Sequence, residues 1–148
     1  MENYLVEHGL PALFLLSFLA ATVIPLGSEW LVVALILQSF HPEYVVAVAT
    51  MGNYLGACTT YFVGLWGAVF LIKKVMRIDE DGLAKAQMLY RRYGAWSLLF
   101  SWLPVIGDSL CLVGGALRIN FFLFSLLVFA GKLARYAVIA ALTASAMP

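Results

Sequence analysis

The chain has 148 residues, of which nine are Lys or Arg and eight are Asp or Glu. Charged residues make up 11% of the sequence, against about 25% in a typical soluble domain. So few charges cannot cover a water-exposed surface, which excludes an ordinary soluble enzyme and a disordered chain, and the net charge of +1 excludes a nucleic-acid binder. We therefore expect an all-α integral membrane protein, built as a single membrane domain over residues 1–148.

The first eight residues contain no Lys or Arg, so they lack the basic region that begins a signal peptide. We expect the N-terminus to be retained. The two cysteines, Cys58 and Cys111, lie in apolar stretches without the partners or spacing of a metal site or disulfide framework. They predict inert buried thiols, no metal and no cofactor.

Residues 9–40 form two short apolar runs separated by Pro25-Leu26-Gly27-Ser28-Glu29. Neither run reaches the ~20 residues that a helix needs to cross a bilayer. We predict a re-entrant helical hairpin that enters the membrane and returns, with Pro25 and Gly27 breaking the helix at its tip. Such a break requires protein or water around its free backbone groups.

Residues 44–72 contain no charged side chain and predict a transmembrane helix, because at ~1.5 Å per residue they exceed the ~30 Å hydrocarbon layer. Small side chains recur there every four residues, at Gly52, Gly56, Thr60 and Gly64. A second helix can approach such a face closely. The face predicts either packing within the chain or a homo-oligomer.

Residues 73–92 hold six of the nine basic residues. Loops rich in Lys and Arg stay in the cytoplasm, so we predict a cytoplasmic linker. After Asp79-Glu80-Asp81 the apolar spacing predicts an amphipathic surface helix. The stripe consists of Leu83, Ala86, Tyr90 and Tyr93. We interpret the segment as a topology determinant and not as a binding patch.

Residues 93–117 repeat the pattern of the first hairpin. A short apolar run ends at Pro104-Val105-Ile106-Gly107-Asp108, and a second short run follows. We predict a second re-entrant hairpin with Pro104 and Gly107 as its breakers. Residues 119–147 predict a final transmembrane helix, although Lys132 and Arg135 lie near its middle.

An offset of 79 residues relates the two halves. It maps Pro25 onto Pro104, Glu29 onto Asp108, Gly52 onto Gly131, Asn53 onto Lys132 and Gly56 onto Arg135. We predict an inverted repeat of a re-entrant hairpin plus a transmembrane helix, with residues 9–72 and 93–147 as its units. Since the linker 73–92 stays on the cytoplasmic side, the two hairpins enter the membrane from opposite sides. Their tips then meet near the midplane, as broken helices do in secondary transporters.

Four charged residues fall inside the predicted membrane segments: Glu29, Asp108, Lys132 and Arg135. Each costs about 2.5–3.5 kcal/mol at a helix centre, so they should face inward and pair. One interpretation is a midplane site that binds an ionic headgroup, a small ion or a proton. The other is a structural cluster of ion pairs that only locks the fold.

Several of these segments together resemble one family. Pro25-Leu26-Gly27-Ser28-Glu29 resembles the Pro-Gly-Glu hairpin of the DedA family, also called the VTT or SNARE-associated domain. Residues 52–67 resemble its Gly-rich helix, and residues 93–104 its second hairpin. The chain is most similar to the short YqaA-type branch. In the family, the second hairpin carries arginines on either side of its proline. This chain departs from that pattern, because the charged residue near Pro104 is Asp108.

The resemblance implies two opposed hairpins, the bacterial inner membrane, and a role in lipid translocation or proton-dependent transport. Family members are linked to flipping of polyprenyl phosphates and scrambling of phospholipids. We therefore expect a lipid flippase, a scramblase or a small proton-coupled transporter, with membrane lipids, a phosphate-bearing lipid and protons as partners and no nucleic acid. The alternative is an assembly protein. No HExxH motif or Ser-His-Asp grouping is present, so we do not expect an enzyme.

Overall fold

The computed structural model describes residues 2–22, 27–67, 80–103 and 106–148. Every regular element in these ranges is a helix. In chain order they are α1 (Glu2–Ala20), α2 (Glu29–Leu37), α3 (Pro42–Leu65), α5 (Glu80–Tyr93), the 3₁₀-helix η1 (Gly94–Trp102), α6 (Ile106–Ala116) and α7 (Phe121–Ala146). The predicted all-α class is therefore correct.

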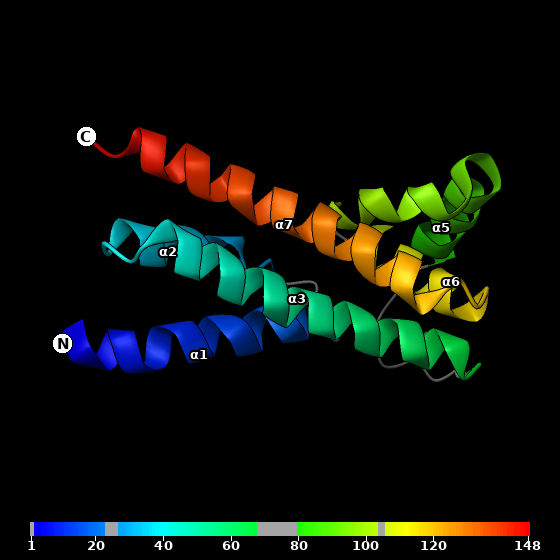
Figure 1. Ribbon diagram of the computed structural model, residues 1–148, viewed down its shortest axis with the longest axis horizontal. Coiled ribbons are helices and arrows are strands. Elements are labelled where there is room, and N and C mark those ends of the chain that lie inside the picture. The colour runs from blue at the N-terminus through cyan, green and yellow to red at the C-terminus, as the bar shows by residue number, and fades with distance from the viewer. Residues whose placement is uncertain (1, 23–26, 68–79, 104–105) are drawn as a thin grey trace.

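Two long helices, α3 and α7, run antiparallel along the whole molecule (Figure 1). The α1–α2 pair lies at the end that holds both chain termini, and α5, η1 and α6 lie at the other end (Figure 1). The two helices of each end pack on different long helices. Helix α1 packs on α3 while α2 packs on α7, and η1 packs on α7 while α6 packs on α3.

Helix α3 is shorter than the predicted span over residues 44–72. It begins at Pro42, whose fixed φ suits a first helical position, and it ends at Leu65. Gly67 follows with φ of +72°, a left-handed conformation that stops a helix and favours glycine. The prediction of one unbroken helix to residue 72 was wrong at this point.

Helix α7 has 26 residues and is capped at its N-terminus by Asn120, whose side chain accepts hydrogen bonds from the backbone N–H groups of Phe122 and Leu123 at 2.9 and 3.3 Å. Among the described helices, α7 alone combines the length and the strongly apolar composition needed to cross a membrane. Helix α3 has 24 residues, but glycines, threonines and an asparagine make it less apolar.

The two predicted hairpins differ in detail from the structure. Helix α1 begins at Glu2, so its 19 residues extend beyond the predicted start at residue 9. The first arm of the second hairpin is a 3₁₀-helix that follows Gly94, which has φ of +62°. The predicted breakers Pro25 and Pro104 lie outside the described residues.

The amphipathic helix of the linker is present as α5. Ala86 is fully buried and Tyr90 packs against the core, where its hydroxyl donates to the Leu110 carbonyl at 2.8 Å. Tyr93, the last residue of the helix, is 45% exposed, and its ring lies beside the Phe100 ring at 5.9 Å between centroids.

The small-residue face of α3 is used inside the chain. A Cβ at Gly52 or Gly56 would lie 2.5 Å from the backbone carbonyl oxygens of Phe14 or Phe18 on α1, and one at Gly64 would meet the Leu112 carbonyl on α6. The Thr60 hydroxyl donates to the Ala21 carbonyl at 3.0 Å, just beyond the end of α1. The face therefore brings α1 and α6 within backbone contact of α3.

We predict that Gly56→Ala destabilises the protein by about 1–3 kcal/mol, because a methyl group there forces α1 away from α3. Gly9→Ala is the matched control, since its Cβ would meet only the ends of two side chains, Leu35 Cδ2 at 3.0 Å and Phe40 Cζ at 3.7 Å. Thermal unfolding in detergent measures both. An equal melting temperature for the two variants would contradict the packing described here.

Candidate functional site

The middle of the molecule is polar, although apolar clusters lie on both sides of it. One cluster contains Val45 and Ala49 of α3 with Tyr136 and Ala140 of α7. The other contains Ala57 and Tyr61 of α3 with Leu127 and Val128 of α7. Between the clusters, α3 contributes Asn53 and α7 contributes Lys132, both buried. Each cluster thus combines residues from both halves of the chain, and the polar residues lie between the two clusters.

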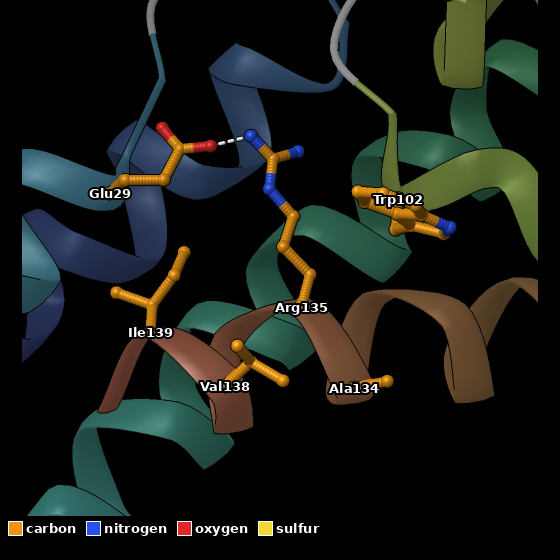
Figure 2. A pocket seen from close by; sticks show the side chains of 6 residues that line it. All are labelled: Glu29, Trp102, Ala134, Arg135, Val138 and Ile139. Carbon is orange, nitrogen blue, oxygen red and sulfur yellow. Dashed lines mark ion pairs between the residues drawn. The ribbon is translucent and has the colours of Figure 1, made fainter. Parts of the chain in front are cut away.

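Ser28 and Glu29, at the start of α2, contact two adjacent residues of α7. Glu29, the first residue of α2, forms an ion pair with Arg135, and Figure 2 shows the two side chains pointing toward each other. Directly before it, the Ser28 hydroxyl hydrogen-bonds the Tyr136 hydroxyl at 2.6 Å. The side chains of Glu29 and Arg135 remain 28% and 19% exposed, so this pair is reachable from outside.

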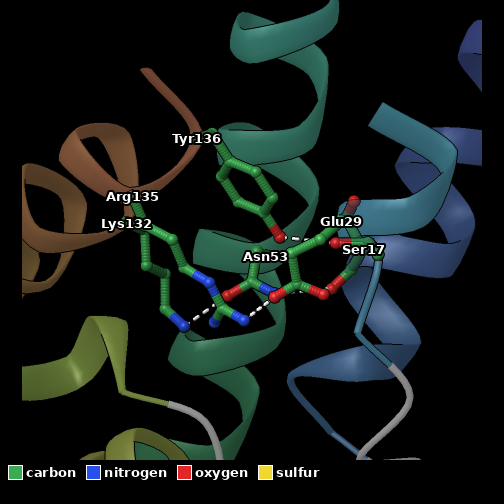
Figure 3. Close-up of polar contacts among 7 residues, drawn as sticks. Ser17, Glu29, Asn53, Lys132, Arg135 and Tyr136 are labelled. Atoms are coloured by element: carbon green, nitrogen blue, oxygen red, sulfur yellow. Dashed lines mark hydrogen bonds and ion pairs between the residues drawn. The ribbon is translucent and has the colours of Figure 1, made fainter. Parts of the chain in front are cut away.

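Lys132 forms a second, sealed set of contacts (Figure 3). Its ammonium group donates to the Asn53 side-chain oxygen, and only 2% of Lys132 is exposed. The Asn53 amide nitrogen in turn donates to the Ser17 carbonyl of α1 at 3.1 Å. Asp108, on the first turn of α6, interacts electrostatically with Lys132. Lys132 therefore links α7 to α3 directly and, through Asn53, to α1.

A cavity of about 520 Å³ opens beside the exposed ion pair (Figure 2). Its lining residues are Glu29, Trp102, Ala134, Arg135, Val138 and Ile139. The two charged groups form one side, and apolar side chains form the rest. Trp102 and Val138 are 45% and 57% exposed, so the cavity is open at the surface of α7. Its shape and chemistry suit an amphiphile with a charged head and an apolar chain.

The four predicted charges are thus brought to the middle of α7 but divided into two sets. Glu29 and Arg135 border the cavity, whereas Lys132 and Asp108 do not. Gly27 fits this arrangement, because a Cβ there would collide with the Glu29 carboxylate, and a Cβ on Gly107 would collide with the Ser101 backbone. Among the described residues, no group of three or more His, Cys, Asp or Glu side chains gathers as a metal site requires.

Sequence reasoning missed Ser28, Tyr136 and Trp102. No signal in the sequence pairs Ser28 with Tyr136, since they lie 108 residues apart. The sequence places Asn53 in the Gly-rich helix and at the position equivalent to Lys132 at the offset of 79 residues, but it predicts no contact between the two side chains. The two equivalent positions touch each other in the structure.

Two comparisons with known proteins indicate the same family. The pattern of the VTT domain matches residues 24–145. The chain is 42% identical over 137 residues to inner membrane protein YqaA of Escherichia coli, covering 92% of each chain. It is also 41% identical to an uncharacterized protein of Haemophilus influenzae, covering 87% of this chain and 83% of that one. No solved structure matches.

We predict that Asn53→Leu destabilises the protein by about 2–4 kcal/mol, because it leaves the buried Lys132 ammonium without its amide acceptor. Thr59→Leu is the control, as it makes a similar change at an exposed position of the same helix. Chemical or thermal unfolding in detergent compares the two. If both variants are equally stable, the Asn53 contact does not hold Lys132.

Proposed function

Because the chain belongs to the VTT-domain family, also called DedA, and is an inner membrane protein, we propose that it moves an amphiphilic or ionic substrate across the bilayer. It acts as a lipid flippase or scramblase, or as a small proton-coupled transporter. The observation that carries the proposal is the open cavity with apolar walls and the Glu29–Arg135 pair on one side. A structural lock would not require an opening.

The membrane arrangement in this proposal is an inverted repeat. The α1–α2 pair and the η1–α6 pair are two opposed re-entrant hairpins, α3 and α7 cross the bilayer, and the linker 73–92 is cytoplasmic. The packing of each pair's two helices on different long helices, α3 and α7, supports it, and so does the contact between the equivalent positions Asn53 and Lys132. Broken helices that meet near the midplane are the usual way to build a transport site.

The ion pair gives the substrate head a binding group that is already partly desolvated. Arg135 can hold a phosphate or another anion through two parallel hydrogen bonds when Glu29 releases it. The apolar chain then lies along Ala134 and Val138, next to Trp102. Membrane lipids, and phosphate-bearing lipids among them, fit this description, and Glu29 is the group that a proton would neutralise.

We predict that Glu29→Gln and Arg135→Gln each slow transport at least about tenfold while the protein stays folded, since each removes one charge of a partly exposed pair. The assay reconstitutes purified protein in phosphatidylethanolamine–phosphatidylglycerol vesicles and follows a fluorescent phospholipid or a polyprenyl phosphate, with and without a pH gradient. Arg91→Gln, at an exposed position on α5, is the control and should match the wild type. No accelerated movement of any lipid by the wild type would contradict the proposal.

The alternative is an assembly protein whose charges only hold the fold, and the direct pairing of Glu29 with Arg135 favours it. Exchanging the two charges separates the hypotheses. We predict that Glu29→Arg/Arg135→Glu recovers the folded yield lost by either single reversal, because the pair is restored, but does not recover transport. Recovery of transport together with yield would contradict a role of the pair in binding the substrate. Recovery of yield by the exchange, with a wild type that moves no lipid, would favour the assembly protein.

A further inference from the structure

The loop that carries Glu29 departs from ordinary helix capping. Ser28 precedes α2 at the N-cap position, where a serine side chain normally accepts a hydrogen bond from the helix backbone. Here the side chain makes no capping bond. Its hydroxyl is directed to Tyr136 of α7 instead, at 2.6 Å. A local preference given up in this way indicates that the contact with α7 matters more than the cap.

The contacts that Ser28 and Glu29 make with α7 differ in their exposure. The Ser28–Tyr136 hydrogen bond is sealed, since each residue is only 1% exposed. The adjacent Glu29–Arg135 pair borders the open cavity and keeps part of both side chains exposed. Two consecutive residues of the tip thus bind two consecutive residues of α7, one pair inside the core and the other within reach of a ligand.

We propose that Tyr136 is a positioning residue: its hydrogen bond to Ser28 holds the first hairpin on α7 while the Glu29–Arg135 pair opens to accept an anionic group. The inference rests on the proposed function for the role of the opening, but the attachment itself does not depend on which substrate is moved. When the pair opens, Arg135 binds the anionic group in place of Glu29. The Ser28–Tyr136 hydrogen bond keeps Glu29 close enough to pair with Arg135 again. The packing of Val32, Leu35 and Ile36 of α2 in the same cluster as Tyr136 supports this attachment.

Amide hydrogen exchange in detergent, read by mass spectrometry on peptides covering residues 28–37, tests the attachment. We expect Glu29→Gln alone and Tyr136→Phe alone to raise exchange at most about threefold, because one contact remains in each. The double variant Glu29→Gln/Tyr136→Phe should raise it at least about tenfold. Ser28→Ala in place of Tyr136→Phe breaks the same bond from the other side and should give the same result.

Tyr54→Phe is the matched control, because the Tyr54 hydroxyl also bonds a serine, Ser125, at 2.8 Å between α3 and α7. Combined with Glu29→Gln, it should leave exchange of residues 28–37 at the level of Glu29→Gln alone. The inference is overturned if Glu29→Gln alone raises the exchange of residues 28–37 at least about tenfold. It is also overturned if adding Tyr136→Phe to Glu29→Gln raises that exchange no further than adding Tyr54→Phe does.

Transport is measured separately in phosphatidylethanolamine–phosphatidylglycerol vesicles with fluorescent phosphatidylglycerol. We expect Tyr136→Phe to slow lipid movement about three- to tenfold and Tyr54→Phe to leave it unchanged. Equal rates for the two variants, with an active wild type, would overturn the positioning role. If the wild type itself moves no lipid, the proposed function fails, and the exchange experiment still decides whether Tyr136 holds the tip.

Discussion

In the proposed membrane arrangement α7 crosses the bilayer. A basic side chain in the middle of such a helix must find a partner, and α7 carries two of them within one turn. Lys132 and Arg135 point into the protein, where α3 and both hairpins meet them. Much of the fold follows from that requirement. Glu29 reaches Arg135 from the start of α2, Asn53 reaches Lys132 from α3, and Asp108 approaches from the start of α6. Without these acceptors, insertion of α7 would cost about 2.5–3.5 kcal/mol for each charge.

The C-terminal end of α1 is buried inside the molecule, where its last backbone carbonyl groups need partners. The structure satisfies them from α3. Asn53 donates to the carbonyl of Ser17 and Thr60 to that of Ala21, so the last turn of α1 and the residue after it are bonded by side chains of the helix on which they pack. Glycines at positions 52 and 56 permit this close approach. The same residues therefore provide close packing and hydrogen bonding.

The sequence predicted the parts of the structure that depend on composition and local pattern. The helical class, the long last helix, the amphipathic α5 and the small-residue face of α3 all follow from spacing and apolar content. Helix ends were less predictable, because Gly67 and Gly94 act through positive φ angles that a hydropathy pattern does not reveal. The gathering of four charged residues near α7 could be expected from the free-energy cost of burying them. Their division into an exposed pair beside the cavity and a buried set around Lys132 could not be expected. Whether Arg135 borders a cavity while Lys132 is sealed depends on tertiary packing, and so does the bond between Ser28 and Tyr136.

The central claim is that this charged cluster lies deep in the bilayer, where only protein partners can stabilise it. The most direct measurement is the depth of a nitroxide spin label at Ala134, an exposed position on α7 next to Arg135, in a variant whose two cysteines are replaced by alanine. In vesicles, the account predicts high accessibility to oxygen and low accessibility to a water-soluble nickel complex, corresponding to a depth more than about 10 Å from either edge of the ~30 Å hydrocarbon layer. A label at the level of the headgroups would contradict the account.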